Sequence, residues 1–174
     1  MTVAMKAKYP GLGEGDVSSL ENKLGHGLSD EYKEFLMAGN VMIPRPNSVQ
    51  GQGMSGSVSK FLGVSSNVDD DLLATRRTYA DRLPDGVIPI ALAGGGNLVC
   101  VYSKNGQMYL WDHEDEAGEG EVVGFDNMHF IAKSFSEFLK VLAPFDSKDA
   151  VLNPDDVISV KLKPGFAEKF KDYR

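Results

Sequence analysis

The spacing of apolar residues near the amino terminus predicts a pair of short helices. Between residues 17 and 24 the apolar positions fall on one helical face, and Ser18 and Glu21 have the spacing of a capping box. Residues 30–38 repeat the pattern, and Ser29 can cap this second helix, whose first turn is acidic. The chain is therefore expected to begin its folded part with two helices joined by a short turn.

Short apolar runs in the middle of the chain predict β-strands. Residues 98–102 and 107–111 flank Asn105-Gly106, a dipeptide that accepts positive φ and therefore favours a tight hairpin. Both arms are apolar on both faces, which predicts a central pair of strands covered by helices. Residues 87–91 form another strand, in which Pro89 indicates an edge position or a bulge.

The remaining periodic segments complete the prediction of an α+β fold. Asn67 can cap a mid-chain helix with acids at 69–71, and Ser134 opens a final helix through a second capping box. The other expected elements are short strands at 60–64, 122–125, 129–132 and 157–162, and a long loop rich in Pro, Gly, Ser and Asn at 44–56. Together they predict a mostly antiparallel central sheet on which the N-terminal helix pair, the mid-chain helix and the C-terminal helix pack.

The composition is that of an ordinary globular protein. Apolar residues make up 42% of the 174-residue chain, and a single cysteine, Cys100, rules out an intrachain disulfide. The amino terminus lacks the apolar core of a signal peptide, and no apolar run approaches the roughly 20 residues of a membrane span. We therefore expect a cytoplasmic protein that makes no use of a membrane.

The formal net charge of −7 narrows the choice of partner. It argues against nucleic acid, because phosphates are bound by clustered Lys and Arg. It is compatible with a basic protein partner, since opposite net charges steer encounters. Mild acidity also keeps a cytosolic protein soluble, and charge alone does not separate these two interpretations.

One stretch, residues 112–121, is chemically distinctive. It holds six carboxylates and no Lys or Arg, and it begins where the strand carrying Trp111 ends. A calcium-binding loop would need glycine at its sixth position and glutamate at its twelfth, where Ala117 and Val123 stand. The stretch is therefore either a solvated, self-repelling loop or a surface that engages a basic partner.

Other candidate motifs do not support an enzyme or a cofactor. Residues 51–56 match the glycine pattern of dinucleotide-binding loops, but prolines precede them and a strand candidate follows, so a loop is expected. The three histidines lack metal-ligand spacing. A nucleophilic arrangement of Cys100, Asp112 and His113 is disfavoured, because Cys100 lies in an apolar strand. We expect no catalytic residue, no metal and no cofactor.

Two separated parts of the chain carry motifs that occur in the same order in a known family. The first is the helix pair of residues 20–36, and the second runs from Ile88-Pro89-Ile90-Ala91 through Gly95-Gly96-Asn97 to Trp111-Asp112-His113-Glu114. With residues 131–135, which open the final helix, these segments resemble the SUKH superfamily. That superfamily includes a yeast cell-wall-assembly regulator and many bacterial immunity proteins. The likeness divides the chain into an arm at 1–16, a domain at 17–142 and an extension at 143–174.

The resemblance implies a fold and a mode of action. The family fold is α+β, with helices on a mostly antiparallel sheet. Its bacterial members lack catalytic residues and bind a cognate toxin domain, often a nuclease. This chain departs from the pattern at Ser29, where the family tends to have proline, and at 38–40, where it tends to have an Asn-Gly-Gly step.

The leading hypothesis from the sequence is a non-enzymatic immunity protein that binds a basic toxin domain. Trp111 is predicted to be an aromatic anchor of the interface, with a core position on the central hairpin as its alternative. The electrostatic complement would come from Asp112, Glu114, Asp115, Glu116, Glu119 and Glu121. Two other hypotheses stay open: a regulatory or scaffold module like the yeast relatives, and a small-ligand domain with a cleft between the sheet and residues 44–56.

Overall fold

The computed structural model describes residues 3–118 and 122–144, and it confirms the predicted α+β class. In these residues four α-helices accompany a six-stranded antiparallel sheet and a separate two-stranded sheet. The predicted strand at 157–162 lies outside the described residues. None of the helices in the described part of the chain has the length and apolar run needed to cross a bilayer.

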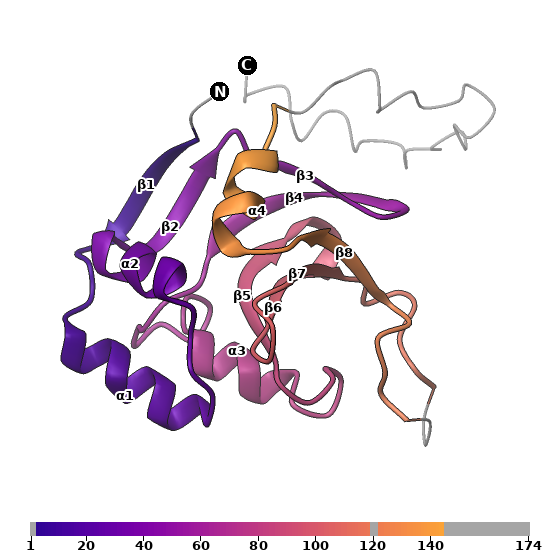
Figure 1. Cartoon of the computed structure of the whole chain (residues 1–174), viewed down its shortest axis with the longest axis horizontal. Helices are drawn as coiled ribbons and strands as arrows, with labels where there is room; N and C mark the ends of the chain where they lie inside the picture. The colour runs from indigo at the N-terminus through magenta and orange to yellow at the C-terminus, as the bar shows by residue number, and fades with distance from the viewer. Residues whose placement is uncertain (1–2, 119–121, 145–174) are drawn as a thin grey trace, which may run out of the picture.

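The six-stranded sheet is a meander, because its strands neighbour one another in the order in which they follow along the chain (Figure 1). Its two outer strands meet at one point, where the Gln52 amide donates to the Phe130 carbonyl at 3.0 Å. The sheet therefore bends back toward its own edge. Its strands are β3 (Ser48–Gly51), β4 (Met54–Phe61), β5 (Val87–Ala93), β6 (Leu98–Tyr102), β7 (Met108–Trp111) and β8 (Met128–Ala132).

The hairpin expected at Asn105-Gly106 is confirmed, since β6 and β7 pair on either side of it and Gly106 has φ +74°. The bulge alternative for Pro89 is also confirmed. The β5–β6 register shifts between Pro89 and Ala91, and β5 is an inner strand, so Pro89 does not lie at an edge.

The N-terminal helix pair is present, but its first member begins earlier than predicted. α1 (Glu14–Leu24) is capped by Gly13, whose amide donates to the Asp16 carboxylate at 3.2 Å. The Ser18–Glu21 capping box is therefore wrong. Glu21 instead accepts the Leu28 amide at 2.8 Å, which fixes the turn into the second helix.

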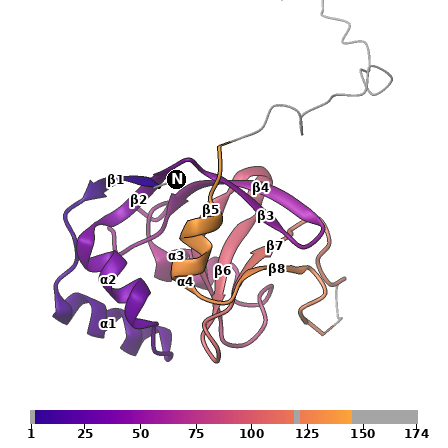
Figure 2. The same ribbon diagram turned by 45° about the horizontal axis from the view of Figure 1, so that its top comes forward.

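The helices α2 (Asp30–Ala38) and α4 (Phe135–Val141) bring aromatic rings onto one face of the sheet. The ring centroids of Phe35 and Phe61 lie 4.8 Å apart, and those of Tyr32 and Phe135 lie 5.0 Å apart, in edge-to-face geometry. Figure 2 shows α4 in front of the sheet, beside α2. As predicted, Ser29 caps α2 and Ser134 caps α4.

The predicted loop at 44–56 is wrong, because it contains the end of β2 (Asn40–Arg45) and the β3–β4 hairpin. β2 pairs with β1 (Ala4–Tyr9) in the two-stranded sheet, and β4 pairs with β5 in the larger one. These pairings are tertiary contacts that outweigh the weak strand propensity of Ser and Gly. The strand predicted at 122–125 is also wrong, since these residues belong to the connection from β7 to β8.

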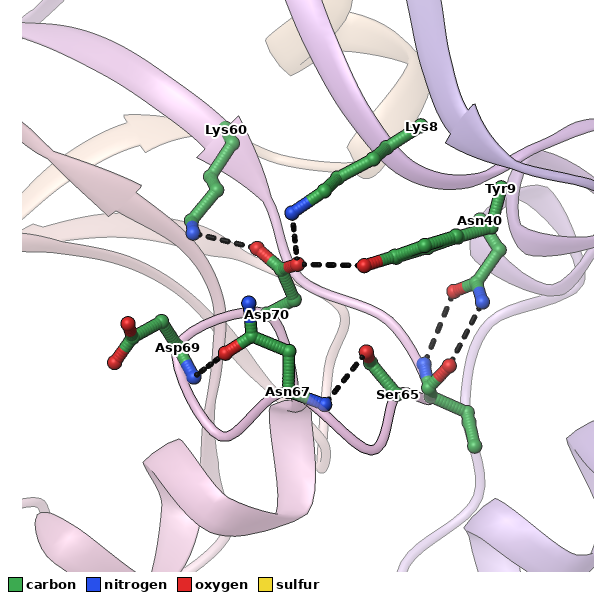
Figure 3. A network of polar contacts seen from close by, with 9 residues as sticks. Lys8, Tyr9, Asn40, Lys60, Ser65, Asn67, Asp69 and Asp70 are labelled. Atoms are coloured by element: carbon green, nitrogen blue, oxygen red, sulfur yellow. Dashed lines mark hydrogen bonds and ion pairs between the residues drawn. The ribbon is translucent and has the colours of Figure 1, made fainter.

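Asp70 explains why the mid-chain helix begins later than predicted. α3 (Leu72–Thr78) is capped by Asp71, whose carboxylate accepts the Ala74 amide at 2.7 Å, and Asn67 lies upstream of it. Asp70 turns inward instead of joining the first helical turn. Its fully buried carboxylate takes hydrogen bonds from Lys60 at 2.6 Å, from the Tyr9 hydroxyl at 3.1 Å and from Lys8 (Figure 3).

Candidate protein-binding surface

The acidic residues singled out above lie in the connection between β7 and β8, which we call the acidic loop (residues 112–127). Its base is closed by two hydrogen bonds: the Asp112 amide donates to the Asn127 carbonyl at 3.0 Å, and the Asn127 side chain donates to the Asp112 carbonyl at 2.8 Å. In both views the loop projects from the end of the sheet away from α1 (Figures 1 and 2). The loop therefore forms one end of the molecule.

Trp111 occupies the core and not the surface. Its indole is 0% exposed and lies edge-on to the Tyr79 ring, with the ring centroids 5.3 Å apart. Neighbouring buried side chains come from β6, β8 and the segment after α3, and they include Leu83, Leu98 and Met128. A side chain enclosed in this way offers no area to a partner, so the core alternative fits Trp111 and the anchor role does not.

Glu116 is held by an internal ion pair that the sequence did not reveal. Arg82, in the segment after α3, reaches Glu116 with two hydrogen bonds, one of them 2.8 Å from Nε to Oε2. The guanidinium also lies over the Tyr79 and Trp111 rings, 4.7 and 5.1 Å from their centroids. The hydrogen bonds from Arg82 hold the pKa of the Glu116 carboxyl below its usual range. Glu116 thus connects the acidic loop to the segment after α3, and Arg82 compensates its negative charge.

Of the other acids that the sequence singled out, two are open to solvent and a third is partly covered. Glu114 and Asp115 are exposed, and neither has an ion pair among the described residues. Asp112 is half-buried, and its carboxylate accepts the Glu114 amide at 2.9 Å, which shapes the start of the loop. The structure therefore brings these three acids together at the root of the loop, whereas Glu119 and Glu121 lie outside the described residues.

A groove of about 920 Å³ adjoins the root of the acidic loop. One wall is the β3–β4 hairpin, and the opposite wall is the Gly94–Gly96 turn with Asp112, His113 and Glu114. The groove thus uses residues that the sequence assigned to an unstructured loop. Because most of its lining is short or polar, it suits an extended segment of a protein better than a bulky apolar ligand.

Asn97 and His113 fix the wall of the groove. The Asn97 side-chain oxygen accepts the His113 backbone amide at 3.1 Å and contacts the ring nitrogen Nδ1 at 2.8 Å. The ring lies against Gly96, where φ is +89° and a Cβ would come within 3.4 Å of it. The positive φ therefore favours glycine at this turn, whereas a Cβ would only be in ordinary van der Waals contact with the ring.

The described side chains around the groove lack two features of a catalytic or metal site. Cys100 is fully buried in β6, and burial raises the pKa of its thiol, so it is not available as a thiolate nucleophile beside His113. No cluster of three or more His, Cys, Asp or Glu side chains within residues 3–118 and 122–144 could hold a metal ion. What the site offers is exposed carboxylate next to an open groove.

Comparison with known proteins agrees with the fold and the order of elements. The family model described as SMI1 / KNR4 family (SUKH-1) matches residues 11–141. The chain belongs to this family. An SPbeta prophage-derived uncharacterized protein of Bacillus subtilis (strain 168), YokK, is 26% identical over 151 residues, which cover 76% of each chain. The resemblance drawn from the sequence to the SUKH superfamily is thus confirmed. As a SUKH-1 chain, the protein belongs to a family that is generally non-catalytic.

Proposed function

We propose that this SUKH-1 protein is a non-enzymatic immunity factor that binds a cognate toxin domain in the cytoplasm and blocks it. Family membership over residues 11–141 supports a role in binding rather than turnover. One observation carries the proposal. The exposed carboxylates of Glu114 and Asp115 lie beside the groove at one end of the molecule.

The electrostatics favour a basic partner such as a nuclease domain. Nucleases carry Lys and Arg around the site that binds phosphates, and an exposed acidic loop would face that site as the substrate does. Attraction between the two surfaces accelerates the encounter, while the groove supplies shape complementarity. Inhibition then follows from occupying the substrate-binding surface and requires no chemistry from this chain.

Co-expression tests the proposal directly. The carboxy-terminal domain of the protein encoded by the neighbouring gene is expressed with and without this chain, and growth and co-purification are scored. We expect rescue of growth and a stable complex, which an inactivated toxin domain also forms. Toxicity that persists at full expression of this chain, with no complex on gel filtration, would contradict the proposal.

The groove also favours a second candidate, the binding of a small ligand. A volume of about 920 Å³ lies within the range of ligand pockets, and the lining includes the apolar side chains of Val49, Met54 and Val141. A metabolite that raises the melting temperature of the purified protein would support this candidate, because ligands that bind only the folded state stabilise it. Recovery of several unrelated cellular proteins instead of one toxin would favour a scaffold role.

A further inference from the structure

An aromatic row lies on the face of the sheet beneath the acidic loop. It consists of Tyr102 on β6, Tyr109 on β7, Phe130 on β8 and Phe125 from the loop itself. The ring centroids form a continuous chain in edge-to-face geometry. The spacings are 5.1 Å from Tyr102 to Phe125, 5.7 Å from Phe125 to Tyr109 and 6.0 Å from Tyr109 to Phe130.

The aromatic row occupies the half of this sheet face that the segment after α3 does not cover. Side chains alternate along each strand, so Tyr102 shares its face with Cys100, and Tyr109 shares its face with Trp111. Tyr79 and Leu83 cover the half that holds Cys100 and Trp111, which is fully buried. The aromatic row is only half-buried, and Phe125 is 39% exposed. Contiguous exposed aromatic area is unusual on a protein surface and marks interaction sites.

The charges around the row indicate which partner it fits. Asp81, Asp115 and Asp126 are exposed and line a hollow of about 410 Å³, whose lining flanks Phe125 in sequence at Gly124 and Asp126. Arg82 and Glu116 also line it, but they compensate each other as an ion pair, so the three aspartates leave the hollow negative. The Lys104 ammonium lies 5.7 Å from the centroid of the Tyr102 ring, which neighbours Phe125, so one ring of the row already attracts a cation. Carboxylates beside aromatic faces accept Arg or Lys side chains and repel phosphates.

We propose that the aromatic row is the apolar anchor of the partner interface, and that it takes a protein segment in which arginine or lysine alternates with aliphatic side chains. The aliphatic groups pack on Tyr109 and Phe130, while a cationic group enters the hollow beside Phe125. The row thus has the role that the sequence assigned to Trp111. This inference rests on the proposed function in requiring a protein partner.

The test uses the toxin domain of the co-expression experiment and isothermal titration calorimetry. Phe125→Ser and Tyr109→Ser are each expected to raise the Kd at least about tenfold, as loss of a central aromatic contact does. Met37→Ser is the matched control, because Met37 is 38% exposed on α2, away from the acidic loop. Tyr109→Phe keeps the ring and loses only the hydroxyl bond to Gln107, so its Kd should not change. An unchanged Kd in both serine variants would overturn the inference while leaving the proposed function intact.

A second probe distinguishes failure of the aromatic-row inference from failure of the proposed function. It is a ten-residue peptide of alternating arginine and leucine, with a glutamate–leucine peptide as its control. Weaker binding of the arginine peptide to Phe125→Ser than to Met37→Ser supports the surface, even where the toxin domain does not bind the wild type and the proposed function fails. Equal binding to both variants counts against the surface. A homodimer or an oligonucleotide complex that Phe125→Ser abolishes would show a different occupant and would overturn the inference.

Discussion

At the scale of single residues, Asp70 is the side chain on which folding depends most clearly. Burial alone would raise the pKa of its carboxyl. Hydrogen bonds from Lys60, Lys8 and Tyr9 outweigh that effect and lower the pKa to about 2. The network joins β4 and the segment before α3 to β1, which is distant from both in sequence (Figure 3). An ionised Asp70 therefore stabilises the assembly of three separate elements.

This network predicts a defined loss of stability in acid. Because the folded pKa lies below the ordinary value of an aspartate carboxyl, the stabilisation is complete above about pH 5 and is lost as the pH falls toward 2. The loss amounts to about 2 kcal/mol, at about 1.4 kcal/mol per pKa unit. Asp70→Asn should lose a similar amount at pH 7, and its free energy of unfolding should vary less between pH 4 and pH 2.5.

Urea unfolding followed by the fluorescence of Trp111, the single tryptophan, measures both quantities. Asp69→Asn is the matched control, since Asp69 is exposed and lies outside the ion network. Parallel pH curves for wild type and Asp70→Asn would show that the buried carboxylate does not carry the acid sensitivity.

At the scale of elements, β2 and the segment after β4 pack in very close contact at Asn40 and Gly63. Asn40 binds Val64 through both its amide group and its side-chain oxygen, at 2.8 and 3.0 Å. Gly63 lies directly beneath, and a Cβ there would stand 1.8 Å from the Asn40 oxygen. The two elements can approach this closely only because residue 63 has no side chain.

Two glycine-to-alanine substitutions should therefore have opposite effects. Gly63→Ala must displace Asn40 and break its two bonds to Val64, which we expect to lower the free energy of unfolding by about 2–4 kcal/mol. Gly15→Ala lies in α1 with no atom within 4 Å of the new Cβ, and it should raise stability by about 0.5–1 kcal/mol. Thermal unfolding of both variants and of the wild type measures these two changes in stability. A Gly63→Ala protein as stable as wild type would contradict the close contact.

The elements that the sequence predicted correctly are those whose signals are local. The β6–β7 hairpin needed only the Asn105-Gly106 turn, and the caps of α2 and α4 needed only Ser29 and Ser134. The β3–β4 hairpin was missed, because its Ser- and Gly-rich strands have little propensity of their own. Gly56 in that hairpin lies against the Leu110 side chain of β7, so the hairpin is placed by packing on a strand far from it in sequence.

The proposed binding surface has a charged part that the sequence makes visible and an aromatic part that it does not. The run of acids at 112–121 is visible in the sequence as a composition, without any knowledge of the fold. Tyr102, Tyr109 and Phe130 stand in three strands with no common motif, so only the register of the sheet places them in one row. Tryptophan is a residue type common at interfaces, which is why the sequence suggests Trp111 as an anchor. Its burial depends on Tyr79, in the segment that follows α3, and the sequence does not show that contact.

At the scale of the whole molecule, the acidic loop and the helix pair lie at opposite ends (Figure 1). Exposed carboxylates gathered at one end give the molecule an electrostatic direction, so that a basic partner is attracted to that end before contact. Such steering acts on the association rate and is screened by salt over about 10 Å at 0.1 M. Glu114, Asp115 and Glu116 do not contribute equally to this steering, because Arg82 already compensates the charge of Glu116.

This difference can be measured by stopped-flow association with the proposed toxin domain. Replacing Glu114 and Asp115 by Gln and Asn should slow association about three- to tenfold at low ionic strength and flatten its salt dependence, since both carboxylates are exposed. Glu116→Gln should leave the salt dependence closer to wild type and should instead lower the melting temperature, because Arg82 loses its partner above Trp111. If the double variant associates as fast as wild type at low salt, the acidic loop does not steer the encounter, and the aromatic row must recognise the partner without it.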